Sequence, residues 1–234
     1  MAQQQMENAV ATVETGNMLA LLQATPPMDM GQMGDFLGAG YVPRIQVMDY
    51  QTGQVKDELI RAGNIGIILD KQTVIDLGSS ASLLLLSWRC KALDMNEEPP
   101  VTSYDRNSDL FKIIASKASD PDAKCLAGLE FLCWNFEKER FVVFYPAGKS
   151  ARSQAQPCCM EFKKFQEGTG PGLVTLTGKK IEKGTYKWFA PVISTCQVTC
   201  TPYPSGVAVK TELDKFLNPK DEVSEVASTD GQER

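Results

Sequence analysis

The chain has 234 residues, of which 43% are hydrophobic and 23% are charged, and its formal net charge is −5. This composition can build a hydrophobic core and excludes a wholly disordered chain. The sequence contains no histidine, so it cannot supply a Ser-His-Asp triad, a Cys-His pair or an imidazole ligand to a metal. We therefore expect a protein that is not an enzyme and has no cofactor, although lysine, carboxylate and thiolate chemistry is formally open.

The first 40 residues are expected to form a flexible N-terminal arm. They are rich in Gln and Met and are interrupted by Pro26, Pro27 and several glycines. The chain begins without the basic region and the apolar region of a signal peptide. The longest aliphatic run, at 83–86, is too short to span a bilayer. These features predict a cytoplasmic protein with no membrane association.

Residues 41–218 are predicted to form the folded domain, which is mainly β with a few helices. Seven segments are rich in β-branched or aromatic residues and are bounded by turn residues. They are 44–48, 64–70, 83–93, 129–136, 140–145, 173–177 and 185–193. In the segment 83–93, apolar residues alternate with Ser87, Arg89 and Lys91, which predicts a strand with one apolar and one cationic face. A tight hairpin turn is expected within 135–140.

Three helices are predicted between and after these strands. The segment 109–118 has an apolar side and follows Ser108, a good N-cap residue. The segment 157–166 begins with a proline in its first turn, and 209–217 repeats apolar residues at helical spacing. Five to seven short strands with few helices indicate a small antiparallel barrel of the OB type, with helical insertions.

The seven cysteines are expected to be reduced and mostly buried, since no secretion signal precedes them. Cys158, Cys159, Cys196 and Cys200 could supply four thiolates to zinc. However, only Cys196 and Cys200 have a spacing that suits a structural zinc site, and adjacent cysteines on a helix point in different directions. Burial is the favoured interpretation, and whether Cys196 and Cys200 bind a metal is left open.

The segment 219–234 is predicted to be a disordered acidic tail. Beyond Pro219 it contains five acidic and two basic residues and no aromatic residue, so it cannot bury enough apolar surface to offset the entropy of ordering. An anionic tail could compete with nucleic acid for a cationic groove, and it is a candidate contact for replication proteins. It ends in Gln-Glu-Arg, without the aromatic terminus of several families that bind single strands.

A basic segment lies within this acidic chain. Residues 138–189 contain ten basic and four acidic residues and therefore carry +6. The cations are interleaved with aromatic residues, most clearly in 183–189, where a strand would place Thr185, Lys187 and Phe189 on one face and Tyr186 and Trp188 on the other. This combination suits single-stranded nucleic acid because cations follow phosphates while aromatic faces stack on bases. The candidate nucleic-acid-binding residues are Arg89, Lys91, Arg140, Lys149, Arg152, Lys183, Tyr186, Lys187 and Trp188.

The same lysines and aromatic residues can also be explained without a nucleic-acid ligand. Lysines on a sheet are often ordinary solvated charges, and Trp88, Phe141 and Phe144 are better explained as parts of the barrel interior. Two glycine-containing loops, at 147–150 and 168–172, lack the spacing of a phosphate loop or a dinucleotide fingerprint.

Three stretches together resemble a group of uncharacterised phage-type proteins. They are the run Tyr-Val-Pro-Arg-Ile-Gln-Val-Met at 41–48 followed by Gly63, the run Trp-Arg-Cys-Lys-Ala-Leu at 88–93, and Lys-Ser-Ala-Arg at 149–152. More loosely, a barrel with a basic strip and an acidic tail resembles virus-encoded single-stranded DNA-binding proteins with OB folds. If a phage encodes the protein, the expected location is the cytoplasm of a bacterial host.

The sequence therefore predicts a sequence-tolerant single-stranded DNA-binding protein for replication or recombination. The alternative is a non-catalytic structural or assembly protein of the virion type. Oligomeric state and the choice between DNA and RNA do not follow from the sequence.

Overall fold

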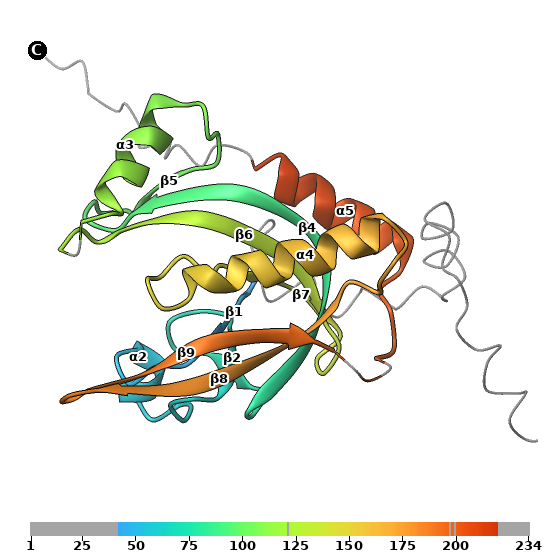
Figure 1. The fold of residues 1–234 in the computed structure, drawn as a ribbon, viewed down its shortest axis with the longest axis horizontal. Helices are drawn as coiled ribbons and strands as arrows, with labels where there is room; N and C mark the ends of the chain where they lie inside the picture. Colours follow the sequence, from blue (N-terminus) through green and yellow to red (C-terminus); the bar gives the residue numbers. More distant parts are fainter. Residues whose placement is uncertain (1–41, 121, 197, 199, 220–234) are drawn as a thin grey trace, which may run out of the picture.

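The computed structural model describes residues 42–120, 122–196, 198 and 200–219. Within these residues the chain is mainly β, with a few helices, as the sequence predicts (Figure 1). The predicted arm, 1–40, and all of the predicted tail except Pro219 lie outside the described residues. In the described part of the chain, no helix is long and apolar enough to cross a membrane.

The strands of the described residues belong to a single sheet. They are β1 (Arg44–Val47), β2 (Ile65–Ile68), β3 (Val74–Asp76), β4 (Ser80–Asp94), β5 (Val101–Ser103), β6 (Cys125–Asn135), β7 (Arg140–Phe144), β8 (Leu173–Lys183) and β9 (Tyr186–Thr195). Their order is β3-β2-β1-β7-β6-β4-β8-β9, and β5 also pairs with β4. Among these described strands, the β1–β7 pair alone is parallel. All seven predicted strands are present, whereas the three-residue strands β3 and β5 were not predicted.

The helices also follow the predicted pattern. They are α2 (Gly53–Lys56), α3 (Asp109–Lys117), the 3-10 turn η3 (Arg152–Gln154), α4 (Ala155–Gln166) and α5 (Gly206–Leu217). Ser108 caps α3 as expected, because its side chain accepts a hydrogen bond from the backbone N–H of Phe111 at 3.1 Å. The single-turn α2 and η3 were not predicted, since neither is long enough to show helical periodicity.

Two hydrophobic cores cover opposite faces of the sheet. On β4, Leu83 and Leu85 belong to the first core, with Cys158 and Phe162 of α4, while Leu84 and Leu86 belong to the second, beneath Phe216 of α5. In Figure 1, α4 lies between the arc of β4 and β6 and the β8–β9 hairpin, and it packs against β4, β8 and β9. A β-bulge between Leu85 and Ser87 shifts the alternation along β4.

The bulge changes the environment of Trp88. The sequence placed Trp88 in the interior together with Phe141 and Phe144. Phe144 is buried and Phe141 half-buried, whereas Trp88 is 42% exposed. The added residue moves the alternation by one position, so the face that buries Leu84 and Leu86 is continued by Arg89 rather than by Trp88.

The sheet curls until its ends lie close together, but it is not closed into a barrel. A Cβ atom at Gly178 of β8 would lie 2.5 Å from the carbonyl oxygen of Gly63, next to β2. At the edge of β9, the backbone N–H of Phe189 donates to the Asp49 carboxylate at 2.9 Å, and that of Ile193 donates to the Gln154 side chain at 2.8 Å. Side chains thus occupy donors that a neighbouring strand would need. The OB-type barrel expected from the sequence is not confirmed.

Candidate nucleic-acid interface

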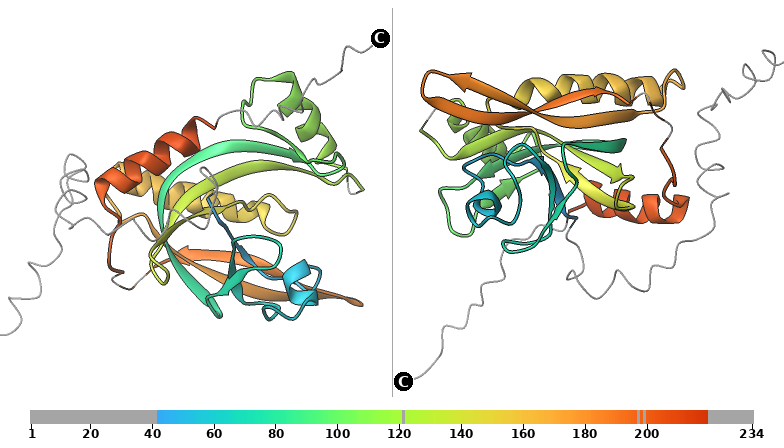
Figure 2. Two further views of the ribbon diagram at one scale, coloured as in Figure 1. Left: turned by 180° about the vertical axis from the view of Figure 1, so that it is seen from behind. Right: turned by 90° about the horizontal axis from the view of Figure 1, so that it is seen from below.

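The β8–β9 hairpin extends beyond the body of the protein (Figures 1 and 2). Its strands pair without a bulge from Val174 and Thr195 to Lys183 and Tyr186 at the tip. The two-residue loop has Gly184 at φ +60°, a conformation that glycine adopts without steric cost. The hairpin therefore holds side chains at fixed positions away from the rest of the sheet.

Cross-strand pairing divides the hairpin side chains between two faces. We define the open face by Lys179, Ile181, Lys183, Tyr186 and Trp188, since Lys183 pairs with Tyr186 and Ile181 pairs with Trp188. The opposite, paired face contains Lys180, Glu182, Lys187 and Phe189. The alternation of Tyr186 and Trp188 with Lys187 and Phe189 that the sequence predicts is confirmed.

The two faces differ in how their charges are compensated. On the paired face, Glu182 lies 2.7 Å from Lys180 and 3.9 Å from Lys187. The ion pair with Glu182 also raises the pKa of Lys180. On the open face, Lys179 and Lys183 are exposed and have no ion-pair or hydrogen-bond partner among the described residues. Two uncompensated cations thus lie on the face that carries both aromatic rings.

Tyr186 and Trp188 lie two residues apart on the open face of β9. Tyr186 is 76% exposed, and Trp188 is half-buried. Residues two apart on one strand lie roughly 6.6 Å apart and point to the same side, so the two rings could each meet a base of an extended strand. Lys183 lies directly across from Tyr186, where its ammonium group could reach the phosphate between two such bases.

Two other predicted residues, Arg89 and Lys91, are compensated inside the protein. Both contact the carboxylate of Glu130 on β6 at 2.6 Å, and that side chain is only 1% exposed. The Arg89 guanidinium also lies 4.2 Å from the Phe216 ring centroid and donates to the carbonyl oxygen of Phe216. These contacts attach α5 to β4, and they leave little of either cation for a nucleic acid.

The remaining predicted cations lie on separate elements. Arg140 begins β7 and is half-buried, its Nε has no hydrogen-bond partner in the described part of the chain, and burial lowers the pKa of its guanidinium. Lys149 is exposed in the loop after β7, and Arg152 is exposed in η3. The structure therefore brings together Lys183, Tyr186, Lys187 and Trp188, and it does not unite the nine residues in one strip.

Sequence reasoning missed Lys179 and Ile181 of the open face. The predicted strand ended at residue 177, because Lys179, Lys180 and Glu182 disfavour a strand. The signal that could have found them is the glycine at 184, which matches a two-residue hairpin turn between two segments of similar length.

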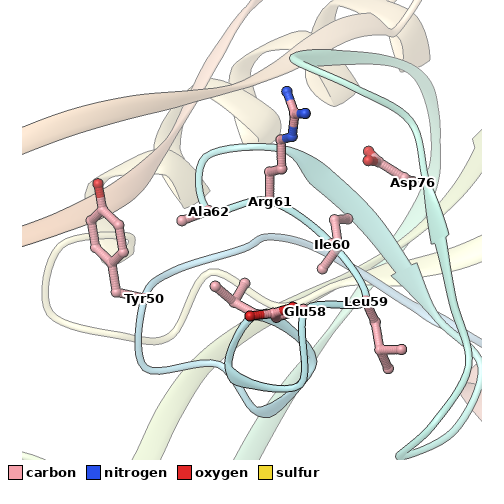
Figure 3. Close-up of a pocket in the computed structure, with 8 residues that line it drawn as sticks. Tyr50, Glu58, Leu59, Ile60, Arg61, Ala62 and Asp76 are labelled. Carbon is pink, nitrogen blue, oxygen red and sulfur yellow. The ribbon is translucent and has the colours of Figure 1, made fainter.

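An open pocket of about 610 Å³ lies beside the hairpin (Figure 3). It is lined by Tyr50, Val55, Glu58, Leu59, Ile60, Arg61, Ala62 and Asp76. The Tyr50 ring lies 5.5 Å from the Phe189 ring, which fixes the pocket next to the paired face. With two carboxylates and one guanidinium, the lining has a formal charge of −1, which does not favour an anionic strand. The pocket is therefore a weaker candidate than the open face.

The seven cysteines are all free thiols. Burial raises the pKa of the Cys158 thiol to about 12. In the described part of the chain, no group of three or more potential ligand side chains is placed to hold a metal ion.

None of the family models, curated proteins and solved structures compared with this chain matches it. The resemblance to phage-type proteins stays a prediction. The geometry of the chain itself is therefore the basis for inferring its function.

Proposed function

We propose that this protein binds single-stranded DNA without sequence preference, in replication or recombination, and that the open face of the hairpin is its contact surface. One observation carries the proposal. Lys179 and Lys183 are exposed and uncompensated beside two aromatic rings on a hairpin that extends from the body. Cations that follow phosphates and rings that stack on bases are the two elements of sequence-tolerant recognition of single strands.

The same arrangement favours a single strand over a duplex. Stacking on Tyr186 requires a base whose face is free, and in a duplex each base face is covered by its neighbours. Lysines attract both forms of DNA, so the preference should come from the aromatic residues and the salt dependence from the lysines. The protein would act in the cytoplasm, which is that of a bacterial host if a phage encodes it. The curled sheet would hold the binding strands rigidly.

The proposal is tested by fluorescence anisotropy with a labelled thirty-nucleotide single strand, its duplex, and an RNA of the same sequence, at two salt concentrations. We expect the single-stranded DNA to bind most tightly and the affinity to fall with salt, by a slope of about 0.7 per phosphate contact. RNA that binds more tightly than DNA would replace DNA as the ligand.

Absence of binding at low salt would overturn the proposal. If the chain then associates with itself in a manner insensitive to salt, the alternative of a structural or assembly protein is favoured. In that case Tyr186 and Trp188 would be contacts between copies, because an apolar contact is not weakened by screening.

A further inference from the structure

Cys196 and Cys200 lie at the junction between β9 and the segment that leads to α5. Their Sγ atoms are 3.7 Å apart, and both thiols also lie within 3.7 Å of the carbonyl oxygen of Val198. Among the described residues, no other two cysteines are joined by a hydrogen bond between their thiols. This pair is therefore distinct from the remaining cysteines.

Both ends of this junction are fixed to the sheet. The backbone N–H of Cys196 donates to the carbonyl oxygen of Leu173 at 3.1 Å. Two residues after Cys200, the carbonyl oxygen of Pro202 accepts a hydrogen bond from the Trp134 indole at 3.0 Å. Because these anchors hold the backbone on each side, the thiols face each other as a consequence of the fold.

We propose that Cys196 and Cys200 form a reversible disulfide bond on exposure to a low-molecular-weight disulfide such as oxidised glutathione. A sulfur–sulfur bond is about 2.05 Å long, so the two Sγ atoms must approach by somewhat less than 2 Å. Rotation of the two side chains about χ1 can supply much of this movement, because each sulfur is one bond removed from its Cβ. This inference is independent of the proposed binding function.

The reaction is a pair of thiol–disulfide exchanges. A thiolate of the pair attacks one sulfur of the small disulfide, forms a mixed disulfide and expels one small thiolate. The second cysteine, as thiolate, then attacks the protein sulfur of the mixed disulfide and expels the other small thiolate. The protein loses two protons and two electrons, and one small disulfide is reduced to two small thiols.

Two features of the site set the rate. The cysteines are each 7% exposed, whereas Val198 between them is 63% exposed, so a small local displacement would be enough to admit the reagent. Burial, and the neighbouring Cys196, raise the pKa of the Cys200 thiol. Because the thiolate is the attacking species, formation of the disulfide should become faster as the pH rises above neutral.

The disulfide would restrain α5. Cys196 and Cys200 belong to the core that also contains Val209 and Phe216 of α5. A bond between them would join the end of β9 to the connection that precedes this helix. Amide hydrogen exchange in α5 should therefore slow in the oxidised protein, because opening of the helix would require the connection to move.

The test uses the full chain treated with oxidised glutathione, blocked with iodoacetamide and digested with trypsin. Cleavage after Lys187 and Lys210 yields one peptide, 188–210, that contains Cys196, Cys200 and no other cysteine. We expect this peptide to be unalkylated and about 2 Da lighter than its reduced form, because it has lost two hydrogen atoms. After reduction with dithiothreitol and a second alkylation, it should carry two alkylated thiols. Its yield should be higher at pH 8.5 than at pH 7.

Matched variants identify the partners. Cys196→Ser and Cys200→Ser should each abolish the lighter peptide, whereas Cys90→Ser, at a half-buried thiol elsewhere, should leave it unchanged. A peptide that carries two alkylated thiols after oxidation, or a lasting glutathione adduct on either cysteine, would overturn the proposal. The peptide map of the unaltered chain gives this answer even if a variant does not fold.

Discussion

Glu130 is a buried charged residue whose stability in the fold depends on its ion-pair partners. Its side chain is 1% exposed, and it contacts both Arg89 and Lys91 at 2.6 Å. Taking a carboxylate out of water costs several kcal/mol, and the two cations offset this cost only while the contacts are intact. The sequence pattern correctly predicted that Arg89 and Lys91 share one face of a strand, but the bulge makes it the face of Leu84 and Leu86 rather than a separate cationic face. It could not predict their partner, because Glu130 lies about 40 residues further along the chain.

Replacing Glu130 with Gln should strongly destabilise the fold. The amide leaves Arg89 and Lys91 without a counter-charge, so we expect a loss of about 3 kcal/mol in the free energy of unfolding, measured with urea. Glu182→Gln is the matched control, since this carboxylate also contacts two lysines but is half-exposed on the hairpin. There we expect less than about 1 kcal/mol. Equal losses for the two variants would show that the Glu130 cluster is not a buried network.

Asp94 at the end of β4 should contribute to acid sensitivity. The backbone N–H of Asn96 is the main cause that lowers the pKa of this carboxyl from 3.8 to about 2, with further help from the Asn96 side chain and from Lys117. A lowered folded-state pKa means that the charged form stabilises the protein above pH 4, and that this stabilisation is lost as the pH falls toward 2. Asp94→Asn should therefore flatten the dependence of the unfolding free energy on pH between 4 and 2. An unchanged slope in that window would contradict this role.

Lysine-to-alanine substitutions on the two faces of the hairpin should differ in their effect on the salt dependence of DNA binding. Lys179→Ala with Lys183→Ala removes two uncompensated cations beside the aromatic rings, and we expect the slope of log affinity against log salt to fall by about 1.4. Lys180→Ala, on the paired face of the same hairpin, removes a cation that already contacts Glu182. It should change the slope much less. Similar changes per lysine would show that only the overall charge of the hairpin matters.

Tyr186 tests the stacking contribution separately. Tyr186→Ala should weaken single-stranded DNA binding by roughly tenfold, within the 1–3 kcal/mol that a stacked base contributes, and should leave the salt slope unchanged. Tyr186→Phe retains a ring and should retain affinity. Loss of affinity in both variants would point to the hydroxyl group rather than to stacking.

The hairpin contains one strand that its own sequence predicts and one that its sequence predicts only in part. The segment at 185–193 has the composition of a strand and was found, together with the faces on which its aromatic residues lie. Its partner continues to Lys183 through residues that rarely favour strands. Pairing with β9 outweighs their intrinsic preference, because each added residue of β8 completes the backbone hydrogen bonds of its neighbour. The open face requires both strands, so it could not be read from either segment alone.

At the scale of the whole molecule, the sequence indicated the class of fold but not its closure. Short strands with turn residues between them predict an antiparallel sheet, and curvature follows from the twist of strands. A sheet closes into a barrel when the backbones of its two end strands hydrogen-bond to each other, and it stays open when side chains bond to those edges instead. Here Asp49 and Gln154 bond to the edge of β9, and neither contact has a sequence signal that distinguishes it from an ordinary turn residue.

The acidic segment after α5 gives the prediction that involves the whole chain. Residues 220–234 carry five acidic and two basic side chains, and fifteen residues can extend to at most about 50 Å. If this segment competes with DNA for the hairpin cations, removing it should tighten single-stranded DNA binding several-fold at low salt. The gain should disappear at high salt, because screening weakens both the competitor and the ligand.

A charge-neutral tail of the same length separates competition from length. Replacing the acidic residues of 220–234 with Asn and Gln should reproduce the effect of truncation, since the anionic charge alone is proposed to act. The gain should also depend on the open face, so truncation combined with Lys179→Ala and Lys183→Ala should tighten binding less than truncation of the parent. Anisotropy titration measures each of these affinities. If truncation leaves the affinity of the parent unchanged at low salt, the segment does not compete, and a solubilising role explains its composition.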